Sequence, residues 1–187
     1  MATTQQQKEF INRMWDAVAG LELHGLLPSV LIAQAALESN WGKSSLAAKY
    51  NNYFGIKAGS SWKGKTVTMS TREVVNGISV TKDSVFRAYD SPAESIADRN
   101  KLLLNNKRYK EVAKAKTAQE QAQAIRSAGY ATATNYVTSI MNIVNSHNLT
   151  ELDEKKKQIM NTKTISIIIL AMGALLAGVG LYNIIKL

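Results

Sequence analysis

An uncharged apolar run near the C-terminus most strongly constrains what this chain can fold into. Residues 165–185 read ISIIILAMGALLAGVGLYNII and contain no Asp, Glu, Lys or Arg. As a helix rising about 1.5 Å per residue, such a run spans about 30 Å, the thickness of the hydrocarbon core of a bilayer. We therefore expect a single C-terminal transmembrane helix over residues 164–187, in contact with a lipid bilayer.

The residues around this run predict how the chain is divided and oriented. Four lysines precede the run and one follows it: Lys155, Lys156, Lys157 and Lys163 against Lys186. This bias is typical of a protein whose N-terminal part starts on the cytoplasmic side, and the start MATTQQQKEF predicts no signal peptide. The prediction is a domain over residues 1–149, a charged linker over 150–163 and an anchor over 164–187.

Composition argues against several kinds of site. The 187 residues include no cysteine, and the two histidines, His24 and His147, are far apart, so we expect no metal and no cofactor. The net charge of +9 suits an anionic partner. Because the lysines and arginines are scattered and form no long stripe, nucleic-acid binding is not expected, whereas bacterial wall polymers and membranes would suit the same excess.

The first 149 residues show a change of pattern from helix to strand and back. Phe10, Met14 and Val18 lie four apart on one helical face, and residues 28–39, PSVLIAQAALES, are apolar nearly all round, which predicts a central helix. A third, short helix is expected over residues 44–50. Four β-branched runs follow between residues 66 and 89, with Asn76-Gly77 at a hairpin position.

Helices resume after these runs. Ser91 to Glu94 and Thr117 to Glu120 form capping boxes, and the second of these helices should stop at Gly129. A last helix carries Tyr136 and Ile140. The order of helices, a small antiparallel sheet and further helices predicts an α+β fold with a cleft between its lobes.

Glu38 is the residue most able to carry chemistry. It falls in the last turn of the central helix, where the negative end of the helix dipole opposes ionisation. Trp41 follows closely and would exclude water from the carboxyl group. Both effects raise the pKa of Glu38, and a carboxyl group that keeps its proton near neutrality can act as a general acid on a glycosidic oxygen.

Five stretches together resemble the glucosaminidases of glycoside hydrolase family 73. In order they are LESNWGKS, NNYFGIK, KGKTVTMSTREVVNG, FRAYDSPAESIADRNKLL and YATATNYVTSIMNIV. The resemblance covers roughly residues 8–148 and implies a lysozyme-like fold, in which a helical lobe and a small antiparallel β-lobe flank a saccharide cleft. It also implies hydrolysis of the β-1,4 bond between N-acetylglucosamine and N-acetylmuramic acid in peptidoglycan strands.

The resemblance assigns roles to eight residues. Glu38 matches the general acid, Glu73 the β-lobe carboxylate that some members use to activate water, and Tyr130 the tyrosine that lines the reaction centre. The residues expected to bind substrate are Trp41, Asn52, Tyr53, Phe54 and Tyr136. Ala133-Thr134 stand where family members often have Asp-Pro, which puts the rigidity of that loop in doubt.

Alternatives remain open at this point. An inverting mechanism needs two carboxylates about 6.5–9.5 Å apart, whereas attack by the acetamido group of the substrate needs only Glu38. A lytic transglycosylase on the same fold and a wall-binding module without chemistry are the competing functions. The expected setting is the membrane of a phage virion, with virion or membrane proteins as partners, or else the bacterial inner membrane.

Overall fold

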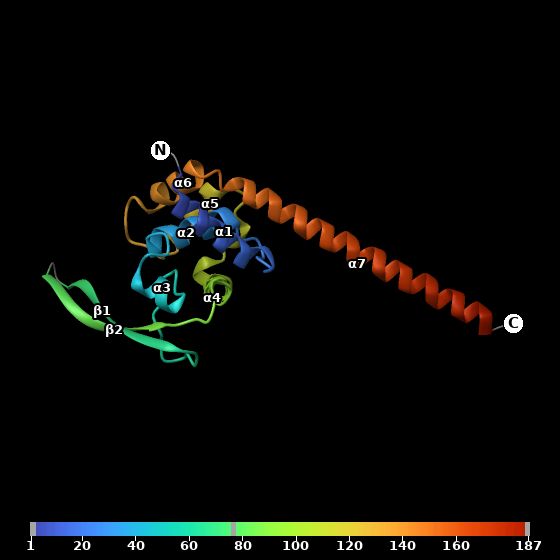
Figure 1. Ribbon diagram of the computed structural model, residues 1–187, viewed down its shortest axis with the longest axis horizontal. Helices are drawn as coiled ribbons and strands as arrows, with labels where there is room; N and C mark the ends of the chain where they lie inside the picture. The colour runs from blue at the N-terminus through green and yellow to red at the C-terminus, as the bar shows by residue number, and fades with distance from the viewer. Residues whose placement is uncertain (1–2, 76–77, 186–187) are drawn as a thin grey trace.

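The computed structural model describes the backbone of residues 3–75 and 78–185, and the side chains of residues 3–71 and 81–170. A helical body carries a β-hairpin on one side and a long helix on the other (Figure 1). The elements in chain order are α1 (Gln5–Ala19), α2 (Pro28–Ser39), α3 (Ser45–Tyr50), β1 (Thr66–Val75), β2 (Ile78–Arg87), α4 (Pro92–Asn105), η1 (Lys107–Tyr109), η2 (Val112–Lys114), α5 (Ala118–Ser127), α6 (Tyr136–Ser146) and α7 (Thr150–Ile185).

Helix α2 forms the centre of the body, as its apolar sequence predicts. Its residues from Pro28 to Ala36 are all buried, and α1, α5, α6 and the start of α7 pack around it. Burying one leucine or isoleucine side chain contributes about 1.5–3 kcal/mol. The consequence for function is that the C-terminal turn of α2, which carries Glu38, is held by the most tightly buried element of the protein.

The predicted helix caps are present, with one difference in their bonding. The hydroxyl groups of Ser91 and Thr117 accept the backbone N–H groups of Glu94 and Glu120, which begins α4 and α5. The two glutamate carboxylates accept from the residues just before the caps, Asp90 and Lys116, and not from the caps themselves. Helix α5 ends at Ser127, and Gly129 follows with φ +78°.

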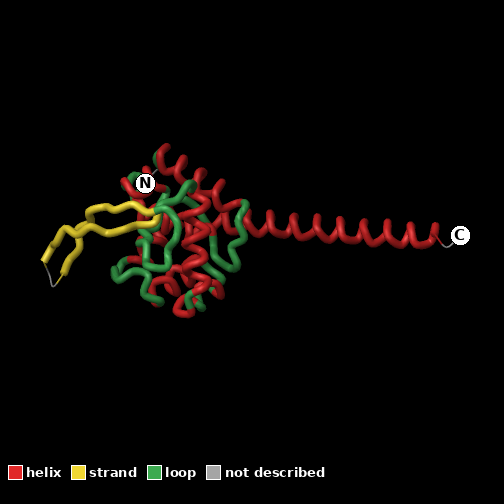
Figure 2. The backbone as a smooth tube through the Cα atoms, turned by 90° about the horizontal axis from the view of Figure 1, so that it is seen from below, coloured by secondary structure: helices red, strands yellow, loops and turns green. Residues whose placement is uncertain are grey.

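The strand region is one hairpin of two ten-residue strands, where the sequence suggested four shorter runs. The strands pair antiparallel from Thr66 with Arg87 to Val75 with Ile78, which confirms the small antiparallel sheet. The turn residues 76–77 lie outside the described residues. Figure 2 shows that the hairpin leaves the body on the side opposite to α7.

Helix α7 starts as part of the body. The carboxylate of buried Asp153 accepts the backbone N–H and the hydroxyl of Ser29, at 2.8 and 2.6 Å. The ammonium group of Lys156 donates to the carbonyl oxygens of Ala19 (2.8 Å) and Leu21. Residues 150–163, expected to form a charged linker, are therefore helical, and their first turns tie the end of α1 to the beginning of α2.

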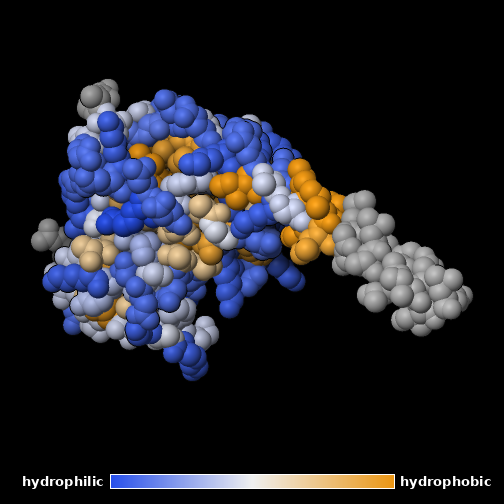
Figure 3. Space-filling model, turned by 45° about the vertical axis from the view of Figure 1, so that its right-hand side comes forward, coloured by the Kyte–Doolittle hydropathy of each residue, from blue (hydrophilic) through white to orange (hydrophobic). Residues whose placement is uncertain are grey.

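The predicted transmembrane helix over residues 164–187 is wrong. Within the described part of the chain, no helix is both long enough and apolar enough to cross a membrane. The apolar run is not a separate element but continues a helix that carries charges up to Lys163, and the described side chains after Lys163 end at Leu170. The apolar side chains from Ile165 to Leu170 are exposed where α7 leaves the body (Figure 3).

The expected membrane localisation depended on that helix. The finding contradicts a single-pass anchor, whether in the membrane of a virion or in the bacterial inner membrane. The lipid partner was inferred from the anchor, and the phage setting from the anchor together with the lack of a visible signal peptide. They are therefore dropped together with it.

Candidate active site

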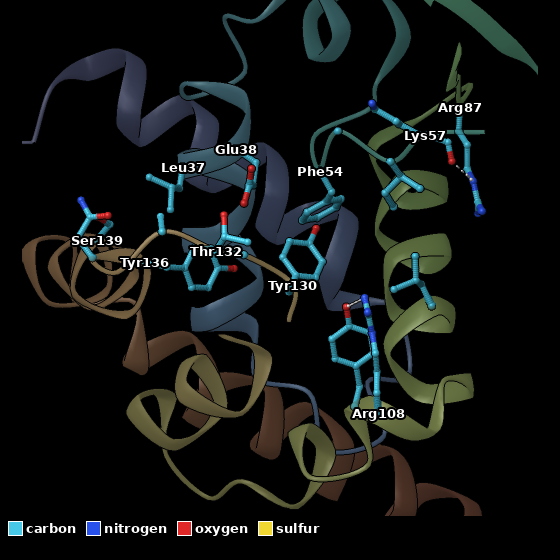
Figure 4. Close-up of a pocket in the computed structure, with 17 residues that line it drawn as sticks. Leu37, Glu38, Phe54, Lys57, Arg87, Arg108, Tyr130, Thr132, Tyr136 and Ser139 are labelled. Carbon is cyan, nitrogen blue, oxygen red and sulfur yellow. Dashed lines mark hydrogen bonds between the residues drawn. The ribbon is translucent and has the colours of Figure 1, made fainter. Parts of the chain in front are cut away.

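A pocket of about 810 Å³ lies between the helical body and the base of the hairpin (Figure 4). The end of α2, the loop after α3, the last residue of β2, the segment after α4 and the segment before α6 all contribute to it. Its lining residues are Leu37, Glu38, Phe54, Gly55, Ile56, Lys57, Arg87, Leu102, Arg108, Tyr109, Tyr130, Ala131, Thr132, Ala133, Asn135, Tyr136 and Ser139.

Glu38 lies in the last turn of α2, next to a sharp end of that helix. The cap residue Asn40 has φ +50°, in the left-handed region. The carboxyl group points into the pocket (Figure 4), and the residue stays exposed on its open side. Burial by the protein on the other sides raises the pKa of Glu38 above its usual range. This shift is toward the protonated form, which is the form a general acid needs.

Two tyrosines line the pocket on the side of α6. Tyr130 follows Gly129, and its ring centroid lies 6.4 Å from that of Tyr136, which is buried at the first position of α6. Burial raises the pKa of both phenols, so both keep their protons and serve as donors. The hydroxyl of Tyr136 has no hydrogen-bond partner within the described residues.

The loop after α3 carries three predicted site residues, Asn52, Tyr53 and Phe54, and they make different contacts. The Asn52 amide donates to the carbonyl oxygens of Ile56 (3.0 Å) and Arg87 (2.8 Å), and its oxygen accepts the N–H of Ile56. Tyr53 packs edge-on against Phe10, with centroids 6.1 Å apart, and does not line the pocket. Phe54 lines it directly. Asn52 and Tyr53 therefore shape the loop that presents Phe54.

Trp41 lies away from the pocket. Its ring packs edge-on against Phe10 and His147, with centroids 5.7 and 4.9 Å away, and it is not among the lining residues. From its position three residues after Glu38, Trp41 was expected to exclude water from that carboxyl group. In the structure, Glu38 shares its pocket with Tyr130 and Tyr136, and Trp41 does not line that pocket.

Glu73 lies on the hairpin, where its backbone pairs with Val80 in the β1–β2 ladder. Its side chain lies outside the described residues. The structure thus brings together Glu38, Phe54, Tyr130 and Tyr136 of the eight predicted site residues.

A group of cationic side chains that the sequence did not point to lies around the same pocket. Lys57, Arg87 and Arg108 line it, and Arg99 lies fully buried nearby, stacked on the ring of Phe54 at 5.7 Å. Arg99 donates to the side-chain oxygen of Gln34 on α2. One signal was available for it, because Arg99 falls three and four residues from Ile96 and Leu103 on the apolar face of α4.

A carboxyl group that favours its proton, set on a groove between a helical body and a β-hairpin, defines the class of lysozyme-like glycoside hydrolases. A family model for glucosaminidases, described as mannosyl-glycoprotein endo-beta-N-acetylglucosaminidase, matches residues 15–149. The chain belongs to this glucosaminidase family.

Similar proteins of known name support this assignment. Exo-glucosaminidase LytG of Bacillus subtilis is 44% identical over 138 residues, which are 71% of this chain and 48% of that protein. Peptidoglycan hydrolase FlgJ of Salmonella typhimurium is 37% identical over 142 residues, 73% of this chain and 45% of FlgJ. The chain therefore spans less than half the length of these curated relatives.

A solved structure supports the fold. The catalytic domain of the autolysin Auto from Listeria monocytogenes is 36% identical, with a TM-score of 0.69, over 82% of this chain and 90% of that domain. The lysozyme-like α+β arrangement with a small antiparallel sheet therefore agrees with the prediction, apart from its transmembrane helix.

Proposed function

We propose that this protein is a peptidoglycan hydrolase that cleaves the β-1,4 bond between N-acetylglucosamine and N-acetylmuramic acid. The observation that carries the proposal is Glu38, whose carboxyl group lines the pocket and has a raised pKa. The names of LytG and FlgJ support the choice of substrate.

Glu38 acts as the general acid in this proposal. It donates its proton to the glycosidic oxygen while the bond from that oxygen to the anomeric carbon breaks, and the N-acetylmuramic acid leaves with a free hydroxyl group. The neutral phenols of Tyr130 and Tyr136 stay in their donor form and hold the sugar beside Glu38. Phe54 offers an aromatic side chain against which a sugar ring packs.

A water molecule completes the reaction at the anomeric carbon. Either Glu73 takes a proton from that water, or the acetamido oxygen of the substrate first closes a ring on the anomeric carbon and water then opens it. In the second route, ionised Glu38 takes the proton of the water and is restored to its acid form. The two routes make different demands on the hairpin, because only the first needs Glu73.

Product analysis tests the proposal. Purified peptidoglycan is digested with the full chain, and the new chain ends are identified by mass spectrometry after reduction. Reducing N-acetylglucosamine ends are expected. Reducing N-acetylmuramic acid ends would contradict the bond assignment, anhydro-muramic ends would indicate a lytic transglycosylase, and intact walls would leave a wall-binding module.

A further inference from the structure

Charge is unevenly distributed along the pocket. Among the residues whose side chains the structure describes, one carboxyl group lines it, that of Glu38, against three cationic side chains: Lys57, Arg87 and Arg108. Figure 4 shows Glu38 on one side of Phe54 and Tyr130 and the three cations on the other side. The middle of the pocket is therefore aromatic and the end away from Glu38 is cationic.

Arg87 is a fixed part of the wall at the cationic end. Its guanidinium donates from Nη1 to both oxygens of the Asp98 carboxylate, at 2.9 and 2.7 Å. It also stacks on the ring of Trp62, 4.4 Å from the centroid. Both members of this ion pair are largely buried, so Arg87 shapes the pocket while Asp98 offsets much of its charge.

Arg108 differs from Arg87 in having no such partner. It is exposed on the short helix η1, and no carboxylate of the described residues lies within ion-pair distance of it. Its guanidinium stacks on the Tyr109 ring, 4.6 Å from the centroid, and donates to the hydroxyl of Tyr109. This contact orients the guanidinium in advance, so less side-chain entropy is lost when it binds a ligand.

The ligand chemistry that suits Arg108 is a carboxylate. Neutral sugar rings need aromatic surface and hydrogen bonds, which Phe54 and Tyr130 offer, whereas a planar guanidinium binds a carboxylate through two parallel hydrogen bonds. In peptidoglycan the carboxylates are carried by the stem peptide on N-acetylmuramic acid. In the cleavage proposed above this sugar is the leaving group, so its peptide begins next to the reacting bond and meets Arg108 where it extends toward the cationic side of the pocket.

We propose, resting on the proposed function, that Arg108 binds a carboxylate of the stem peptide carried by N-acetylmuramic acid. Arg87 and Lys57 contribute positive potential on the same side of the pocket. The enzyme thereby distinguishes peptide-bearing strands from bare glycan at this subsite.

The test compares two substrates that differ in the stem peptide and in the lactyl carboxylate that an amidase leaves on N-acetylmuramic acid. Peptidoglycan freed of teichoic acid is digested as such, and after its stem peptides have been removed by an amidase. The full-chain wild type is compared with Arg108→Gln, with Arg108→Lys, and with Lys110→Gln. Lys110 is exposed just after η1 and does not line the pocket, so its variant is a matched loss of one charge.

Arg108→Gln is expected to lower kcat/KM on peptide-bearing strands about three- to fivefold, the effect of losing one exposed ion pair. The same variant should match wild type on bare glycan, and Arg108→Lys should recover part of the loss. High salt should shrink the difference between Arg108→Gln and wild type, because salt screens exposed charges. Lys110→Gln should match wild type on both substrates.

Four results would overturn the proposal. Equal losses on both substrates would place Arg108 against the glycan itself or its lactyl group and not against the peptide, and no loss on either would remove it from recognition. A loss seen only on walls that retain teichoic acid, included as a third substrate, would assign the subsite to polymer phosphates. Wild type that cleaves neither strand would overturn the proposed function as well, which separates that failure from the first three.

Discussion

The helical body and the β-hairpin are held in different ways, although both border the pocket. The body is joined by buried polar contacts between distant segments, such as Asp153 with Ser29 and Arg99 with Gln34. Backbone hydrogen bonds join the strands to the body at the base of the hairpin. The N–H of Arg87 donates to the carbonyl of Ile56, and the N–H of Ala58 donates to the carbonyl of Val85. The two walls of the pocket thus differ in how firmly they are fixed.

This difference bears on the two carboxyl groups. Glu38 lies on α2, which is packed on nearly all sides, so the position of a proton donor is fixed before substrate binds. Glu73 lies on a strand that, within the described part of the chain, pairs with the other strand of the hairpin alone. We therefore expect the rate of cleavage to depend strongly on residues of the body and weakly on residues of the hairpin.

The largest effect is expected for Glu38→Gln. The amide cannot donate an acid proton, and general acid catalysis contributes about 10²- to 10⁴-fold, so kcat/KM on purified peptidoglycan should fall by that factor. Glu9→Gln, an exposed substitution on α1 away from the pocket, is the control and should match wild type. Substantial activity in Glu38→Gln would remove Glu38 from the acid role.

The next largest effect is a loss of stability in Arg99→Ala. The substitution empties a fully buried site and leaves the side-chain oxygens of Gln34 and Asn100 without their donor. We expect the free energy of unfolding to fall by about 3 kcal/mol, measured by urea denaturation. Lys101→Ala, exposed on the same helix, should change it by about 0.5 kcal/mol or less. Similar values for the two variants would show that Arg99 does not join α4 to α2.

Asp153→Asn tests the junction between α7 and the body. The Asp153 carboxylate caps the first turn of α2 through two bonds to Ser29, and losing a helix cap costs about 0.5–2 kcal/mol. We expect the free energy of unfolding, measured by urea denaturation, to fall by an amount near the upper end of that range, because Asp153 is buried. Glu151→Gln, two residues earlier and exposed, controls for the loss of charge. If both variants unfold at the same urea concentration, the cap contributes nothing to stability.

Glu73→Gln should have a smaller effect on activity than Glu38→Gln. If the acetamido group of the substrate attacks, kcat/KM on peptidoglycan should fall by about tenfold or less, since no general base is lost. The activity of Glu38→Gln in the same assay is the reference. A loss as large as that of Glu38→Gln would mean that the hairpin supplies the group that activates water, and the contrast between the two walls would fail.

The smallest effect concerns stability and pH. Because burial raises the pKa of Glu38 in the folded state, the folded protein binds more protons than the unfolded chain between the ordinary carboxyl pKa and the raised one. Stability from this group is therefore lost as pH rises through that window. At neutral pH, Glu38→Gln should melt at a higher temperature than wild type, and the difference should vanish below the ordinary carboxyl pKa. A lower melting temperature at neutral pH would contradict the raised pKa.

Local features of the fold could be predicted, and contacts between distant residues could not. The caps at Ser91 and Thr117 involve groups three residues apart, so their sequence pattern sufficed. Asp153 looked like part of a linker because its partner, Ser29, is 124 residues away. The length of the hairpin was missed because its pairing depends on register between strands and not on the composition of each run.

The candidate site shows the same limit. The placement of Glu38 at the end of α2 followed from helix periodicity and the family resemblance, and its position in the pocket agrees with that expectation. Asn52 and Tyr53 were expected at the substrate but hold the loop that presents Phe54. Arg108 carries no pattern of its own, since only the folded chain brings η1 beside the loop of Phe54.

The junction between α7 and the body fixes the direction in which this helix leaves the body. As one helix of 36 residues, α7 is about 54 Å long. Its first turns are bonded to the end of α1 and the beginning of α2, so the helix continues from the body without a break. A partner that binds the far end of α7 would therefore hold the active site at a defined distance and direction from itself.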